Sequence, residues 1–195
     1  TNNVSYAGGS EYPAIGGVVA KAGIKTANES VKITDCKNTG KVSVTVWNSN
    51  NLRMGGVVGW TSIPVEGSAA NALENSGEVT TNKSTTLKTA YIGGVIGQSI
   101  STFNTIYNTG NVTVINASTT SSQKVYVGGV AGFMDKKAAE TIKQGNNTGI
   151  INVSCGELDG TEDYVVGGIV GMANATSITS NGTSKVQSNS NSGDI

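Results

Sequence analysis

The chain has 195 residues, of which 36% are hydrophobic and 13% are charged, and its 13 basic and 13 acidic residues leave no formal net charge. Disordered chains usually combine low hydrophobicity with high net charge, so this composition predicts a folded protein. Nucleic acids and anionic membranes are normally approached through a basic surface, and we therefore predict neither as a partner. The apolar runs are shorter than the roughly 18 residues of a membrane span, so none is expected.

A glycine-pair motif recurs along the chain as "AIGGVVA", "RMGGVVG", "YIGGVIG", "YVGGVAG" and "VVGGIVG". Its period of roughly 35 to 40 residues is typical of stacked or circular repeats. Neither a P-loop nor a dinucleotide-binding fingerprint is present, so we predict that these glycines pack the backbone rather than bind phosphate. The pairs are Gly16 and Gly17, Gly55 and Gly56, Gly93 and Gly94, Gly128 and Gly129, and Gly167 and Gly168.

A second motif, Asn-Thr/Ser-Gly-x-Val/Ile, follows each glycine pair. Asn and Gly tolerate left-handed backbone conformations, so the motif predicts a turn between two strands. If the repeats stack, the asparagine amides are expected to hydrogen-bond from coil to coil. These asparagines are Asn38, Asn75, Asn108, Asn147 and Asn191.

Each repeat is predicted to contain three strands, in chain order. The first holds the glycine pair, and its two alternating sets of residues are both apolar or glycine, which indicates burial on both faces or a smooth exposed strip. The third alternates with period two, as in "KVSVTV", where Val42 and Val44 face one side and Ser43 the other. The second ends five residues before the Asn motif, at Ile33, Ala70, Phe103, Ile142 or Val186.

These patterns predict an all-β fold, a right-handed β-solenoid of about five coils with polar loops. A five-bladed β-propeller is the alternative, but its blades have four strands rather than three. We predict one repeat array over residues 1–195, and because it begins at Thr1 and stops within a motif, we expect it to be a piece of a longer protein. The approximate units are 12–50, 51–89, 90–124, 125–163 and 164–195.

The pairing of "GGxxG" with a following "N-T/S-G-x-V" resembles the glycine-rich GLUG-type repeats of bacterial surface adhesins, which also occur beside IgA-specific metallopeptidase domains. The resemblance covers nearly the whole chain, although the units here are longer because of their polar loops. It implies a secreted or cell-surface bacterial β-solenoid, and it supplies no catalytic residues to carry over.

The inventory of catalytic groups is poor, because the chain has no histidine, the commonest general base and metal ligand. We therefore expect no catalytic residue and no enzyme. The one dense acidic group lies in "GELDGTED", where carboxylate oxygens suit calcium, the only cofactor that the sequence suggests; a solvated acidic loop is the other interpretation. Its members are Glu157, Asp159, Glu162 and Asp163.

Aromatic residues are few, so their positions carry information. Trp47 lies in a polar loop, and Tyr91 and Tyr126 share a position next to the glycine strand with Arg53. Aromatic rings beside polar donors could bind the apolar faces and hydroxyls of sugars, so these four residues are the predicted ligand-binding set. Trp60 and Phe133 occupy another common position and are interpreted as packing residues.

The leading hypothesis is a non-enzymatic adhesin-like repeat module at the bacterial cell surface. It would act as a stalk or as a surface that binds glycans or host proteins. The alternative is a fragment of a carbohydrate-active β-helix, similar to a polysaccharide lyase, that holds calcium in its acidic loop. A third hypothesis is ice binding through outward hydroxyl rows such as Ser43, Thr80 and Thr113, although Asn152 and charged neighbours interrupt the array.

Overall fold

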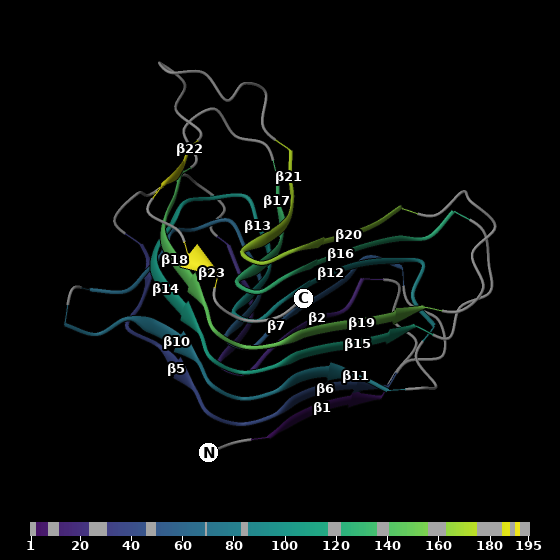
Figure 1. Cartoon of the computed structure of the whole chain (residues 1–195). Coiled ribbons are helices and arrows are strands. Elements are labelled where there is room, and N and C mark those ends of the chain that lie inside the picture. The colour runs from purple at the N-terminus through teal and green to yellow at the C-terminus, as the bar shows by residue number, and fades with distance from the viewer. Residues whose placement is uncertain are drawn as a thin grey trace.

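The chain folds into parallel strands that stack repeat upon repeat, a β-solenoid (Figure 1). The described residues form strands and turns without a helix, so none of them belongs to a helix that is long and apolar enough to cross a membrane. The computed structural model describes residues 3–7, 12–23, 31–45, 50–68, 70–82, 86–116, 122–135, 141–155, 163–174, 185–187 and 190–191. The predicted all-β solenoid is confirmed, and its parallel pairing excludes the propeller, which is built from antiparallel strands.

The strands form four parallel sheets, which we name A to D. In spatial order, sheet A contains β1 (Val4–Ala7), β6 (Val42–Thr45), β11 (Val79–Thr81), β15 (Val112–Asn116) and β19 (Ile151–Cys155). Sheet B contains β2 (Ala14–Gly16), β7 (Leu52–Gly55), β12 (Thr89–Gly93), β16 (Lys124–Gly128) and β20 (Asp163–Gly167). Sheet C contains β3 (Val19–Ala22), β8 (Val58–Thr61), β13 (Ile96–Ser99), β17 (Ala131–Met134) and β21 (Val170–Ala173). Sheet D contains β5 (Lys37–Asn38), β10 (Leu73–Asn75), β14 (Phe103–Asn108), β18 (Thr141–Asn147) and β22 (Lys185–Gln187), with β4 (Ile33–Thr34), β9 (Val65–Glu66) and β23 (Ser190–Asn191) beside them.

The interior of the coil is divided into two hydrophobic cores. One lies between sheets A and B and contains residues such as Val42, Met54 and Ile92. The other lies between sheets C and D and contains Val95 and Phe103. The alternation predicted for the third strand of each repeat is confirmed in β6, because its valines are buried and its polar residues face outward.

Two corners of the coil meet between these cores. Each glycine pair makes the corner from sheet B to sheet C, and a Cβ atom on Gly55 would lie within 3.0 Å of the carbonyl oxygens of Val58 and Val95, closer than real Cβ atoms come. A Cβ atom on Gly56 would meet the side-chain amide of Asn75 just as closely. The first glycine is therefore required by the sharp corner, and the second by the asparagine across the coil.

Four asparagines of the second motif, Asn38, Asn75, Asn108 and Asn147, form a buried ladder at the corner from sheet D to sheet A. Asn38 Nδ2 donates to Asn75 Oδ1 over 2.8 Å, Asn75 Nδ2 to Asn108 Oδ1 over 3.0 Å, and Asn108 Nδ2 to Asn147 Oδ1 over 2.8 Å. Each amide also donates to the carbonyl of the glycine in its own motif, as Asn75 does to Gly77. Each rung thus connects two layers and closes its own turn.

The prediction of three strands per repeat was wrong. The glycine segment is not one strand, because the chain turns at the glycine pair and continues from sheet B into sheet C. Ile92, before the pair in β12, belongs to the A/B core, whereas Val95 and Ile96, after it, belong to the C/D core. Both alternating sets are apolar because the segment serves two cores in succession.

The prediction of about five coils was slightly too high. In sheets B, C and D, three layers have a neighbouring strand on both sides: β7 to β11, β12 to β15 and β16 to β19. The first glycine pair lies in the first layer, β2 to β6, and the last glycine pair lies in the fifth layer, β20 to β23. Each of these terminal layers is covered on one side by a complete layer. The repeat therefore encloses about three turns, with a further layer at each end.

The second layer carries extra residues in sheet D, and they explain an error in the sequence analysis. Val65, not Ala70, pairs with Ile33 and Phe103, because ten residues lead from Val65 to Asn75, whereas five lead from Phe103 to Asn108. Counting back from Asn75 therefore selected the exposed Ala70 in place of the buried Val65.

Three ion pairs join the first layer to the second. Each lysine lies in the first layer and each glutamate in the second, and the side chains are partly exposed. The Nζ to Oε2 distances are 2.9 Å for Lys32 and Glu66, 2.8 Å for Lys37 and Glu74, and 2.8 Å for Lys41 and Glu78.

The contact between the two corners makes Gly94 intolerant of a methyl group. We expect Gly94→Ala to lower the free energy of unfolding by about 1–3 kcal/mol, because the new Cβ would overlap Gly129 O and the Asn108 amide. Urea unfolding measures the loss. The control, Gly23→Ala, should cost less, because the atoms nearest to its Cβ would be in the side chains of Ser62 and Trp60 and would lie no closer than 3.0 Å. Equal losses in the two variants would contradict this role of the corner.

The ladder predicts a pH-dependent defect in Asn75→Asp. A carboxylate in place of the fully buried amide would face the acceptors Gly77 O and Asn108 Oδ1, and we expect a loss of about 3 kcal/mol or more near pH 7. Burial would raise the pKa of this carboxyl above its unfolded value of about 3.9, so the loss should shrink as the pH falls toward that value. Unfolding of variant and parent at each pH measures the difference, and a pH-independent loss would contradict the argument.

Candidate functional site

The outer faces of sheets B and C bring together a set of aromatic and polar side chains, which we call the B–C cluster. Two rows of paired positions contribute to it. On sheet B, Arg53 pairs with Tyr91, and Tyr91 with Tyr126. On sheet C, the row consists of Lys21, Trp60, Gln98 and Phe133, in successive layers.

The two rows contact one another across the angle between the sheets. Tyr91 and Phe133 stack with ring centroids 4.8 Å apart, and Tyr126 lies 5.7 Å from Phe133 and 5.8 Å from Tyr91. Glycines allow this approach, since a Cβ on Gly97 of sheet C would overlap the backbone of Met54 in sheet B. The aromatic stack therefore joins the sheets outside the two cores.

The polar members of the cluster lie toward the first layers. Arg53 Nε donates to Gln98 Oε1 across the angle between the sheets. Lys21 Nζ lies 5.2 Å above the ring centre of Trp60, a cation–π contact. Burial raises the pKa of Tyr91, while the nearby Arg53 guanidinium opposes this rise and Asp135 adds to it.

At the opposite end, the cluster is acidic. Tyr126 is only 8% exposed, and its hydroxyl donates to Asp163 Oδ2 over 2.8 Å. Burial, followed by this hydrogen bond and the charge of Asp163, raises the pKa of Tyr126 from 10.0 to about 12. The phenol of Tyr126 therefore stays neutral to a higher pH than an ordinary tyrosine does.

The structure brings together three of the four residues predicted to bind a ligand, namely Arg53, Tyr91 and Tyr126. The fourth, Trp47, lies outside the described residues. Asp163, predicted as a calcium ligand, accepts the hydrogen bond from Tyr126. The other predicted calcium ligands, Glu157, Asp159 and Glu162, also lie outside the described residues. Within the described part of the chain, no three His, Cys, Asp or Glu side chains gather to hold a metal ion.

Sequence reasoning missed Lys21 and Gln98 and assigned Trp60 and Phe133 only to packing. Phe133 does pack, since it is 9% exposed within the stack. A signal was present, because the residue directly after each motif, which ends in Ala20 in the first copy and in glycine in the others, shares one register position on sheet C. Its nearness to the tyrosine row follows only from the turn at the glycine pair, which brings the chain back beside sheet B.

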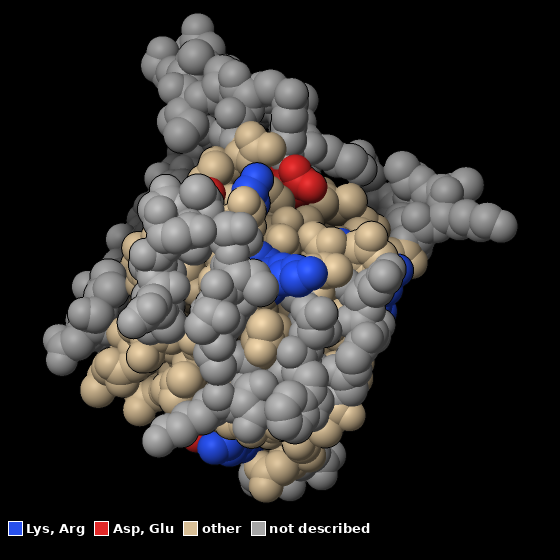
Figure 2. Space-filling view, turned by 90° about the vertical axis from the view of Figure 1, so that its right-hand side faces the viewer, with Lys and Arg blue, Asp and Glu red and all other residues tan. Residues whose placement is uncertain are grey.

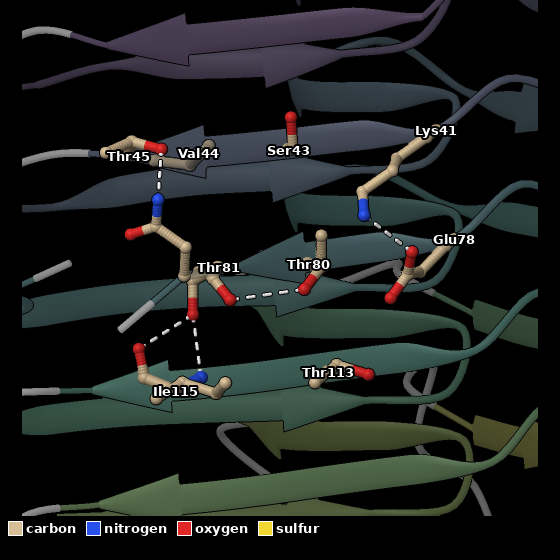
Figure 3. A pocket seen from close by; sticks show the side chains of 10 residues that line it. Lys41, Ser43, Val44, Thr45, Glu78, Thr80, Thr81, Thr113 and Ile115 are labelled. Atoms are coloured by element: carbon tan, nitrogen blue, oxygen red, sulfur yellow. Dashed lines mark hydrogen bonds and ion pairs between the residues drawn. The ribbon is translucent and has the colours of Figure 1, made fainter. Parts of the chain in front are cut away.

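A second surface lies on the outer face of sheet A, where a shallow hollow of about 500 Å³ is lined mainly by hydroxyl and charged side chains (Figure 3). Ser43, Thr80 and Thr113 occupy successive layers of one row there, followed by Asn152. The row proposed for ice binding therefore exists, but the ion pair of Lys41 and Glu78 lies beside it.

Charge is spread thinly over the face in Figure 2, where uncharged side chains dominate the described residues and a few basic and acidic side chains lie among them.

No protein-family model matches the chain, and no curated protein or solved structure matches it either.

The raised pKa of Tyr126 gives a spectroscopic prediction. In the tyrosinate absorbance difference between the parent and Tyr126→Phe, the titration midpoint should lie near pH 12 rather than near 10.0, and Asp163→Asn should lower it. Because the folded pKa is raised, the contribution of Tyr126 to stability is fully present below pH 10 and is lost as the pH rises through about 12. A midpoint unchanged by Asp163→Asn would show that the hydrogen bond has no influence.

Proposed function

We propose that this chain is a non-enzymatic repeat module of a bacterial cell-surface protein, of the kind that the resemblance to GLUG-type adhesin repeats implies, and that the B–C cluster binds glycans. The observation that carries the proposal is the cluster itself. Most inward positions of the described strands pack in two cores, and on the outer faces of sheets B and C aromatic rings lie beside Arg and Gln donors. Such a combination of apolar rings and polar donors suits sugars.

We propose that the module also acts as a spacer, and the continuous stack of layers supports this role. Parallel hydrogen bonds, the amide ladder and two unbroken cores run through successive layers, which makes the array a stiff element. A stiff array suits a module that holds a binding surface away from a cell. Host surface proteins are the other class of partner for such a module.

The carbohydrate-active alternative has less support. Three of the four acidic residues on which it depended lie outside the described residues, and Asp163 is engaged by Tyr126. No specific observation in the described part of the chain favours it, so we do not propose catalysis.

The proposal is tested by a screen of the chain against immobilised glycans and host matrix proteins, with and without calcium. We expect saturable glycan binding that Tyr91→Ala weakens roughly tenfold or more, because the ring is lost from the centre of the cluster. The matched control is Tyr107→Ala, which removes an exposed tyrosine from sheet D and should leave binding unchanged.

Tyr91→Phe distinguishes an effect on binding from an effect on folding. This variant keeps the stacked ring and removes only the hydroxyl, so the packing of the cluster is preserved. If no glycan binds, or if Tyr107→Ala weakens binding as much as Tyr91→Ala does, the B–C cluster is not the binding surface. Binding to a matrix protein alone would replace glycans by proteins as the partner class.

A further inference from the structure

The second and third layers of the B–C cluster contain hydrogen-bond donors that the described residues leave unused. Arg53 donates through Nε to Gln98, and its two terminal nitrogens have no partner among the described residues. The same is true of the indole N–H of Trp60 and the hydroxyl of Tyr91. These side chains belong to two adjacent layers, the second and the third.

Gln98 is the most informative of these residues. It is only 6% exposed, and its carbonyl oxygen accepts from Arg53, whereas its amide nitrogen has no partner within the described part of the chain. A buried amide donor that lacks a hydrogen bond costs about 1–3 kcal/mol. An oxygen atom from a bound molecule would remove that cost.

The cluster is also polarised along the stack. The cations Lys21 and Arg53 lie in the first two layers, and in the described structure neither pairs with a carboxylate. Asp135 and Asp163 follow in the last two layers. Three strand spacings, roughly 14 Å, separate the layer of Arg53 from that of Asp163.

We propose that the Arg53 end of the cluster binds an oligosaccharide that carries one carboxylate. This inference rests on the proposed glycan-binding function and specifies its ligand. The carboxylate accepts from the terminal nitrogens of Arg53, a pairing whose planar geometry favours two parallel hydrogen bonds. Sugar oxygens accept from Gln98 Nε2 and from the N–H of Trp60, while Tyr91 contacts the ring.

The acidic end of the cluster limits the charge of the ligand. A polymer with a carboxylate on every residue, or a nucleic acid, would place further negative charge beside Asp163. A neutral sugar would leave Arg53 without an anionic partner. A saccharide with a single carboxylate agrees with both ends of the cluster.

The test compares sialyllactose with lactose, which differ by the one carboxylated sugar, in calorimetric titrations of the chain. We expect lactose to bind at least roughly tenfold more weakly, since a charge-assisted hydrogen bond is lost, and added salt to weaken sialyllactose binding. Arg53→Gln should abolish the difference between the two sugars. Lys143→Gln removes one exposed positive charge from sheet D and should leave the difference intact.

Thermal unfolding of each variant checks that it is folded. A second variant, Trp60→Phe, keeps a ring but removes the unpaired N–H, and it should weaken sialyllactose binding several-fold. Equal affinity for sialyllactose and lactose would overturn the inference while leaving a glycan-binding module. Tighter binding of polygalacturonate or of a glutamate-rich peptide would also overturn it. Failure of every glycan in the broader screen would instead remove the proposed function on which it rests.

Discussion

The structure depends on one contact, that between the second glycine of the first four pairs and the asparagine amide on the opposite side of the coil. Gly56 against Asn75 and Gly94 against Asn108 leave no room for a methyl group. This contact draws two corners of the coil together and separates the interior into two thin cores. Each core is one pair of facing sheets, which valine and isoleucine fill, so few large side chains are needed.

The asparagine can fill this position because its polar groups are satisfied in both directions. Along the stack it bonds to the next amide, and within its own turn it bonds to a glycine carbonyl. A single such hydrogen bond contributes only about 1 kcal/mol, but an unsatisfied buried amide costs more, so the ladder is stable only when complete. The glycine pair and the asparagine are therefore one structural requirement, and chemical variety is left to the outward positions.

The two motifs allowed much of the fold to be predicted from the sequence. The spacing of the glycine pairs and asparagines gave the repeat, and the alternation around Val42 and Val44 gave the strand of sheet A. The corner at the glycine pair could not be predicted, because period-two patterns do not show where a strand bends when both sides are buried. The extra loop before Leu73 was also hidden, since Ala70 and Val65 are both apolar.

For the candidate site, the sequence identified one row and missed the other. Arg53, Tyr91 and Tyr126 share a position relative to the glycine pair, so they could be grouped without coordinates. Gln98 is an ordinary polar residue in the sequence, and only the return of the chain as sheet C places it opposite Arg53. The link between Tyr126 and Asp163 joins successive repeats and has no local pattern.

The three ion pairs between the first two layers bear on how a repetitive chain finds its order. Layers that share one backbone shape are nearly interchangeable, so a chain could align a layer with the wrong neighbour as it folds. Each exposed ion pair contributes little stability. Their arrangement is nevertheless specific, because aligning the first layer with the third would set Lys37 beside Tyr107 instead of Glu74. The lysines of the first layer thus distinguish the second layer from the third, although the backbones of these two layers share one shape.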